Sequence, residues 1–107
     1  MMEKNIVLVC SAGMSTSMLV AKMKEEAQKE GLSYDIRAIG STEALNYVKE
    51  NKTDVILLGP QVRYLESTYN KELVGLDIPI SVIKPQDYGT MNGKNVLDYA
   101  KTLMNVE

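Results

Sequence analysis

The sequence contains no histidine and a single cysteine, Cys10. Without histidine, this chain cannot form a Ser-His-Asp or Cys-His catalytic set from its own residues. A lone cysteine excludes an internal disulfide, and the usual zinc sites need several cysteine or histidine ligands. We therefore expect neither a metal nor a cofactor. If Cys10 takes part in chemistry, other groups must manage its proton.

Long apolar runs and blocks of one charge are also absent. No stretch approaches the roughly 20 apolar residues that cross a bilayer, and residues 1–9 are too short an apolar run for a signal peptide. The 12 basic and 14 acidic residues are interspersed and give a net charge of −2. This balance disfavours binding to nucleic acid or to an anionic membrane surface. We expect a cytoplasmic protein without direct membrane insertion.

The hydrophobic pattern predicts one α/β domain that spans residues 1–107, a length that suits a single core. Short apolar segments predict strands over 5–9, 34–39, 54–58 and 79–83. Between and after them, apolar residues recur at helical spacing over 17–30, 42–49, 60–73 and 96–104. Such alternation indicates a four-stranded parallel sheet of order 2-1-3-4 with helices on both faces.

Particular residues mark the expected ends and faces of these elements. Gly31 is the expected stop of the first helix and Ser41 the expected N-cap of the second. Pro60 suits the first position of the third helix, and residues 85–93 are expected to form a loop. In the first helix, the predicted buried face consists of Met18, Leu19, Met23 and Ala27.

The predicted strand order puts the topological switch point of the sheet beside the first strand. Ligands of open α/β sheets bind at the carboxyl ends of the strands, next to that point. Cys10 follows the apolar segment Ile6–Val9 directly. The fold therefore nominates Cys10 as the centre of a site.

The segment after Cys10 has the composition of an anion-binding loop. None of its residues is proline, so each retains a backbone N–H, and the following helix adds the positive end of its dipole. Hydrogen bonds and the dipole favour the thiolate of Cys10, which is the nucleophilic form. The predicted phosphate-binding residues are Ser11, Ala12, Gly13, Met14, Ser15, Thr16 and Ser17.

A plainer interpretation is that Cys10 is a small packing residue and that the serines only cap the helix. Packing is likewise the alternative for Met14, whose thioether also suits a docking contact with a partner protein.

The absence of basic residues from this loop argues against two kinds of phosphate site. No Lys or Arg lies between Cys10 and Ala21, so the segment is not a Walker A loop. Cysteine phosphatases of the low-molecular-weight type carry an arginine six positions after the cysteine, where this chain has Thr16. An arginine there stabilises the charge of the transition state, so its absence argues against efficient hydrolysis.

Three segments together resemble the lactose/cellobiose-type enzyme IIB components of bacterial phosphotransferase systems (PTS). They are the run Cys10–Ser17, the run Leu57-Leu58-Gly59-Pro60-Gln61 and the turn Asp87-Tyr88-Gly89. The resemblance covers nearly the whole chain, and the first run is its most specific part.

The resemblance implies that the chain is a phosphoryl carrier. In that family, a cysteine at the place of Cys10 accepts phosphate from a phosphohistidine of the IIA component. It passes the group to a sugar, here cellobiose or a related β-disaccharide, bound by the membrane component IIC. Gln61 and Tyr88 are candidates for groups around the cysteine, with packing as the alternative for Tyr88.

Two other functions stay open at this point. One is a low-molecular-weight cysteine phosphatase-like hydrolase or a reductase, and the other is a module that binds a small anion without covalent chemistry. Cys10→Ser separates the carrier from the binding module, because covalent labelling requires the thiol.

Overall fold

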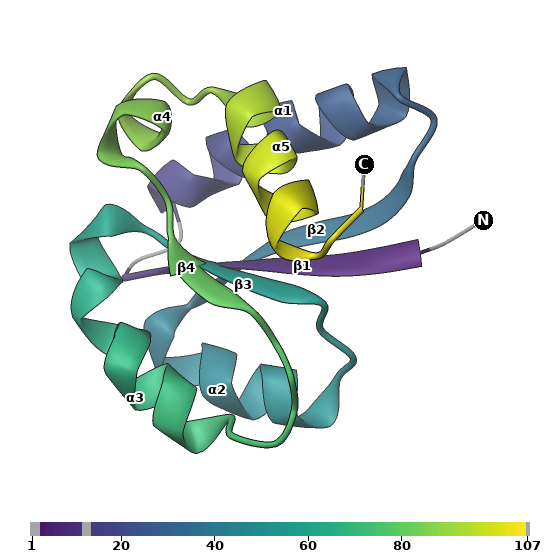
Figure 1. The fold of residues 1–107 in the computed structure, drawn as a ribbon. Coiled ribbons are helices and arrows are strands. Elements are labelled where there is room, and N and C mark those ends of the chain that lie inside the picture. Colours follow the sequence, from purple (N-terminus) through teal and green to yellow (C-terminus); the bar gives the residue numbers. More distant parts are fainter. Residues whose placement is uncertain (1–2, 12–13, 107) are drawn as a thin grey trace.

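Four parallel strands form one sheet in the order β2-β1-β3-β4 in the computed structural model, which describes residues 3–11 and 14–106. This confirms the predicted fold class and strand order (Figure 1). The strands are β1 (Glu3–Cys10), β2 (Ser33–Gly40), β3 (Val55–Leu58) and β4 (Ile80–Val82).

Strand β1 lies inside the sheet, with a parallel neighbour along each edge. Ile6 is in register with Ile36 of β2 on one side and with Val55 of β3 on the other. The segment Ile6–Cys10 is buried throughout. A strand covered on both faces needs an unbroken apolar run, which is why β1 lacks the alternation of a half-exposed strand.

Helices cover the two faces of the sheet in two groups. Helices α1 (Met14–Lys29) and α5 (Gly93–Leu103) lie on one face (Figure 1). On the opposite face lie α2 (Ser41–Glu50) and α3 (Glu66–Glu72). Two short elements, the 3₁₀ helix η1 (Pro60–Leu65) and helix α4 (Pro85–Gly89), follow β3 and β4 near the carboxyl end of the sheet.

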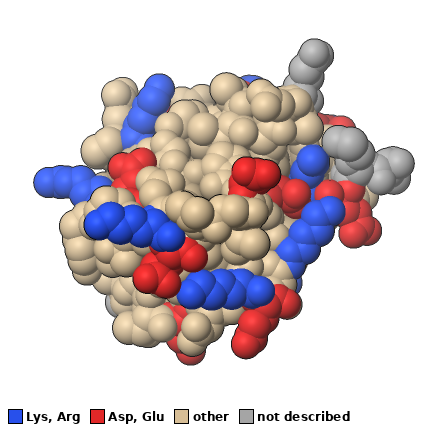
Figure 2. Space-filling model, turned by 60° about the horizontal axis from the view of Figure 1, so that its bottom comes forward, with Lys and Arg blue, Asp and Glu red and all other residues tan. Residues whose placement is uncertain are grey.

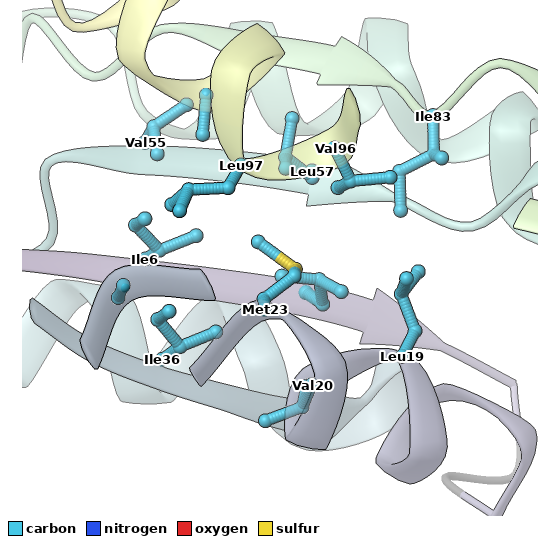
Figure 3. Packing of buried hydrophobic residues seen from close by; sticks show 13 residues of the cluster. Ile6, Leu19, Val20, Met23, Ile36, Val55, Leu57, Ile83, Val96 and Leu97 are labelled. Atoms are coloured by element: carbon cyan, nitrogen blue, oxygen red, sulfur yellow. The ribbon is translucent and has the colours of Figure 1, made fainter. Parts of the chain in front are cut away.

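The sheet separates the core into two clusters of buried side chains. Ile6 and Leu8 of β1 point into the cluster under α1 and α5, whereas Val7 and Val9 point into the cluster under α2 and α3. Figure 3 shows the first cluster, in which Met23 of α1 lies among side chains from the sheet and α5. Because successive residues of a strand face opposite ways, β1 contributes to both clusters.

Two expected boundaries are confirmed by the backbone. Gly31 adopts a φ of +71°, a left-handed conformation that glycine tolerates at the end of a helix. Its neighbour Leu32 donates its N–H to the carbonyl of Ala27 at 2.9 Å, which closes the last turn of α1. Pro60 is the first residue of η1, where the missing N–H of proline costs no hydrogen bond.

The predicted buried face of α1 was wrong at one position. Met18 is 59% exposed, while Val20 is buried in its place. The buried stripe runs at helical spacing through Thr16, Leu19, Val20, Met23 and Ala27. It includes Thr16 because α1 begins at Met14, three residues before the predicted start.

Ser41 does not cap α2, contrary to expectation. Ser41 is the first residue of the helix. The N-cap is Gly40, which has no side chain that could accept a hydrogen bond from the helix. Gly40 is also the last residue of β2 and keeps an extended conformation, with φ −65° and ψ 150°. The chain therefore turns directly from strand to helix, and the N-cap position falls on a residue without a capping side chain.

The regions after Pro60 and Pro85 also differ from expectation. The helix expected from Pro60 onward is divided into η1 and α3, with a non-helical conformation at Val62 (φ −118°). The expected loop over 85–93 contains α4, whose first residue is Pro85. Proline has the φ of a first helical turn already set, so this segment coils before the chain reaches α5.

Charged side chains of both signs lie on the surface without a large area of one sign on the face shown in Figure 2. Some of them form ion pairs, such as Lys49 of α2 with Glu72 of α3 at 3.2 Å. Exposed pairs of this kind contribute little to stability. Among the described residues, no helix is both long and apolar enough to pass through a bilayer.

We predict that Gly93→Ala destabilises the chain by about 1–3 kcal/mol, the usual cost of overpacking. A Cβ at Gly93 would lie 2.6 Å from the carbonyl carbon of Lys22, so α1 and α5 would have to separate. Gly89→Ala is the matched control, since nothing lies within 4 Å of its added Cβ. Urea unfolding measures both, and equal midpoints for the two variants would contradict the close packing.

We also predict that Tyr69 makes the chain less stable at alkaline pH. Burial, and next the charge of Tyr64, raises the pKa of Tyr69 above its ordinary value of 10.0. The folded chain then holds this proton more tightly than the unfolded chain does. Its contribution is complete below pH 10 and is lost as pH rises through the folded-state pKa.

Tyr69→Phe should therefore show a shallower loss of unfolding free energy above pH 10 than the wild type. At neutral pH it should be less stable by about 1 kcal/mol, because the Tyr69 hydroxyl donates to the Ser41 carbonyl at 3.2 Å. Denaturant unfolding at several pH values tests this, and parallel alkaline curves would refute it.

Candidate functional site

Cys10 lies at the switch point of the sheet. It is the last residue of β1, and the chain leaves β1 toward β2 on one side, while β3 pairs with β1 on the other. The connecting helices α1 and α2 lie on opposite faces, so they diverge from this edge (Figure 1). Such an edge is where open α/β sheets place their ligands.

The cysteine is enclosed by backbone more than by side chains. Cys10 is 4% exposed, and its thiol donates to the carbonyl of Ile39 at 3.9 Å, a weak contact. Gly40 lies beside it in the β1–β2 register. On the other side, Gly59 donates its N–H to the carbonyl of Val9 at 2.8 Å. Cys10 belongs to neither core cluster, so the thiol lies at the end of the core.

Half of the predicted loop is the first turn of a helix. Met14, Ser15, Thr16 and Ser17 begin α1, whereas the predicted helix started only at Ser17. The N–H groups of a first helical turn have no acceptor within their own helix, which is the general basis of anion binding at helix N-termini. Ser11 and Ser17 are exposed, while Ala12 and Gly13 lie outside the described residues. The docking role considered for the Met14 side chain also lies outside the described part of the chain.

Thr16 faces the interior. Its side chain is fully buried, and its hydroxyl lies 3.4 Å from the hydroxyl of Tyr88. Tyr88 is half-buried on α4, not in a loop, and its ring packs against the core cluster under α1 and α5. The structure thus brings together two predicted site residues that are 72 positions apart in the sequence.

The turn after β3 supplies the third part of the site. A Cβ built on Gly59 would lie 3.6 Å from Cε1 of Tyr88 and 3.5 Å from Oε1 of Gln61. Gln61 is exposed and its side chain turns back over Gly59. Gln61 and Tyr88 therefore both lie beside the turn that pairs with the end of β1.

Two neighbours of Cys10, Ile39 and Gly40, were missed as site residues. They end β2, and the parallel register places them level with the end of β1. Extending the predicted strands to equal lengths would have found them. Among residues 3–11 and 14–106, no group of three or more His, Cys, Asp or Glu side chains gathers in a way that would hold a metal ion.

Comparison with known proteins decides the family. Residues 5–99 match the family model described as the PTS system, lactose/cellobiose-specific IIB subunit. The chain belongs to this family. It is thus a sugar phosphotransfer component of the IIB type.

Individual relatives agree with this assignment over the whole length. The galactose-specific EIIB component of Lactococcus lactis subsp. cremoris (strain MG1363) is 44% identical over 98% of this chain and 100% of its own. The cellobiose-specific EIIB component of Lactococcus lactis subsp. lactis (strain IL1403) has the same identity and coverage. The solution structure of the cellobiose-specific IIB component from Borrelia burgdorferi superposes with a TM-score of 0.79 at 40% identity, covering 97% of this chain and 94% of that one.

We predict that a side chain at Gly59 strains the turn beside Cys10 in this IIB chain. An added Cβ would lie 3.3 Å from the Val9 carbonyl oxygen, which already accepts the N–H of Gly59. Gly59→Ala should therefore be less stable than Gly40→Ala by about 1 kcal/mol.

Gly40→Ala is the matched control for this comparison. Gly40 is also an N-cap with negative φ, so both variants lose the same preference for glycine at a cap. The nearest atom to its added Cβ is Oε1 of Glu43, at an ordinary 3.8 Å. Thermal unfolding measures the difference, and equal stability of the two variants would show that the Val9 carbonyl can move.

Proposed function

We propose that Cys10 is the phosphoryl-carrying nucleophile of this IIB chain. The observation that carries the proposal is its position at the carboxyl end of β1, at the switch point and directly before the amino end of α1. There, first-turn N–H groups and the helix dipole favour both a thiolate and the oxygens of a phosphoryl group. Membership of the IIB family supplies the reaction class.

The carrier cycle consists of two displacements. In the first, the Cys10 thiolate attacks the phosphorus of a phosphohistidine on the IIA component. The sulfur–phosphorus bond forms, the phosphorus–nitrogen bond breaks, and the released imidazole takes a proton. In the second, a hydroxyl of the sugar bound by the membrane component IIC attacks phosphorus, loses its proton, and releases the Cys10 thiolate.

This cycle suits a chain that has no histidine of its own, because the donor histidine belongs to the partner. Much of the rate then comes from bringing two positioned groups together when the proteins dock. IIC is a membrane component, so we propose that the transfer from Cys10 to the sugar takes place at the cytoplasmic face of the membrane.

The sugar is set mainly by IIC in this proposal. Relatives with different sugars in their names, galactose and cellobiose, are equally similar to this chain at 44% identity. Cellobiose or a related β-disaccharide is our proposed substrate, in line with the lactose/cellobiose description of the family.

The buried Thr16 at the place of the phosphatase arginine disfavours hydrolysis as the main activity. The residue six positions after Cys10 is Thr16, which is fully buried and faces Tyr88. A phosphatase of the low-molecular-weight type needs a guanidinium there to pair with the phosphoryl oxygens. The phosphoryl group on Cys10 would thus persist until an acceptor docks.

The prediction is a gain of one phosphoryl group on Cys10. We expect it when the chain is incubated with phosphoenolpyruvate, the general phosphorelay proteins and the IIA component of a characterised cellobiose system. Intact-mass analysis followed by peptide mapping locates the group. Cys10→Ser should show no phosphocysteine, although its fold should persist.

Ser33→Ala is the control, because Ser33 is exposed at the start of β2, at the other end of the strand from Gly40, and should be labelled like the wild type. Two results would count against the proposal. Labelling of the wild type at a residue other than Cys10 would mean that this other residue is the nucleophile. Rapid hydrolysis of an aryl phosphate by the chain alone would favour the phosphatase.

A further inference from the structure

The buried hydroxyl of Thr16 needs an explanation. Thr16 is 0% exposed and lies on the stripe of α1 that faces the core. Buried polar atoms in proteins are almost always hydrogen-bonded, and the Thr16 hydroxyl faces the hydroxyl of Tyr88. Thr16 is also in the first turn of α1, directly after the cysteine loop.

The contact between the two hydroxyls is long. Their oxygens are 3.4 Å apart, whereas hydroxyl–hydroxyl hydrogen bonds usually measure about 2.7–2.8 Å. A contact of this length contributes little to the stability of the resting fold. Hydrogen bonds that serve a reaction are often long in the unliganded protein and shorten when the reacting group is bound.

Tyr88 also lies close to the opposite side of the site. Its ring lies 3.6 Å from the position of a Cβ on Gly59, and Gly59 is hydrogen-bonded to Val9, the residue before Cys10. The same ring packs against the core cluster under α1 and α5, which fixes its position. One side chain thus connects the first turn of α1 with the turn after β3.

We propose that Tyr88 is a positioning residue for phosphoryl transfer on Cys10. Its hydroxyl acts through Thr16 to fix the first turn of α1, whose N–H groups would receive the phosphoryl oxygens. This inference rests on the proposed function of Cys10. Preorganised donors matter most at the transition state, where charge on the phosphoryl oxygens is redistributed.

Tyr88→Phe tests the hydroxyl alone, because the phenyl ring keeps the packing against Gly59 and the core. We expect kcat for transfer from the phosphorylated IIA component to fall roughly two- to tenfold, the factor that one hydrogen bond is worth. KM for phosphorylated IIA should stay unchanged, since the docking surface is not altered. The melting temperature should change little.

Thr16→Val removes the other hydroxyl and keeps the shape of the side chain. If the two hydroxyls act as one unit, Thr16→Val should lower kcat by a similar factor. The double variant should then be no slower than the slower single variant. Full multiplication of the two effects would mean that Tyr88 does not act through Thr16, and would overturn the inference.

Tyr99→Phe is the matched control. Tyr99 is half-buried, packs against the same core cluster as Tyr88, and shares a hydrogen bond with the hydroxyl of Ser81. Loss of the Tyr99 hydroxyl should lower the melting temperature without changing kcat for transfer from the phosphorylated IIA component. The role of Tyr88 would be overturned if Tyr88→Phe had the kcat of the wild type, or no larger effect on kcat than Tyr99→Phe. Continued labelling of Cys10 would show that the carrier proposal itself still holds. A wild-type chain that gains no phosphoryl group would overturn both proposals.

Discussion

The pairing of β1 along both of its edges is the constraint on which the site depends. Eight residues of β1 are in register with β2 and four with β3, so this strand has neither a free edge nor an exposed face over its apolar part. The backbone that ends at Cys10 is thereby fixed from both sides. Sites built on such elements hold their geometry more closely than sites on loops. The cysteine gains its position from the sheet and not from contacts of its own.

That constraint also explains why so much of the site is backbone. Parallel strands that end level with one another bring the residues after them together, here Gly40 beside Cys10 and Gly59 beside Val9. A side chain at Gly59 would press on the Val9 carbonyl, so glycine favours the close approach of the turn after β3 to β1. A phosphoryl group needs donors more than it needs catalytic side chains.

Periodicity and topology rules predicted the sheet, its order and the place of Cys10, because each of these follows from residue patterns within short segments. The errors arose where distant contacts decide the outcome. Met18 was expected on the buried stripe of α1, whereas packing on the core cluster buries Val20 and leaves Met18 exposed. The burial of Thr16 and its approach to Tyr88 depend on how α4 folds back over α1, which no local pattern contains. Ser41 has the chemistry of a cap, but the cap position falls on Gly40, the last residue of β2, and Ser41 is the first residue of the helix.

The orientation of Thr16 bears on the difference between a carrier and a hydrolase. An arginine at this position would have to leave the buried stripe of α1, since an unpaired guanidinium in the core is costly. The stripe that packs α1 on the sheet therefore also keeps position 16 uncharged and turned toward Tyr88. The packing of α1 and the proposed carrier chemistry thus both require an uncharged side chain at position 16. In the proposed cycle, a phosphoryl group on Cys10 would meet no guanidinium at position 16 and would be held until a better-placed acceptor docks.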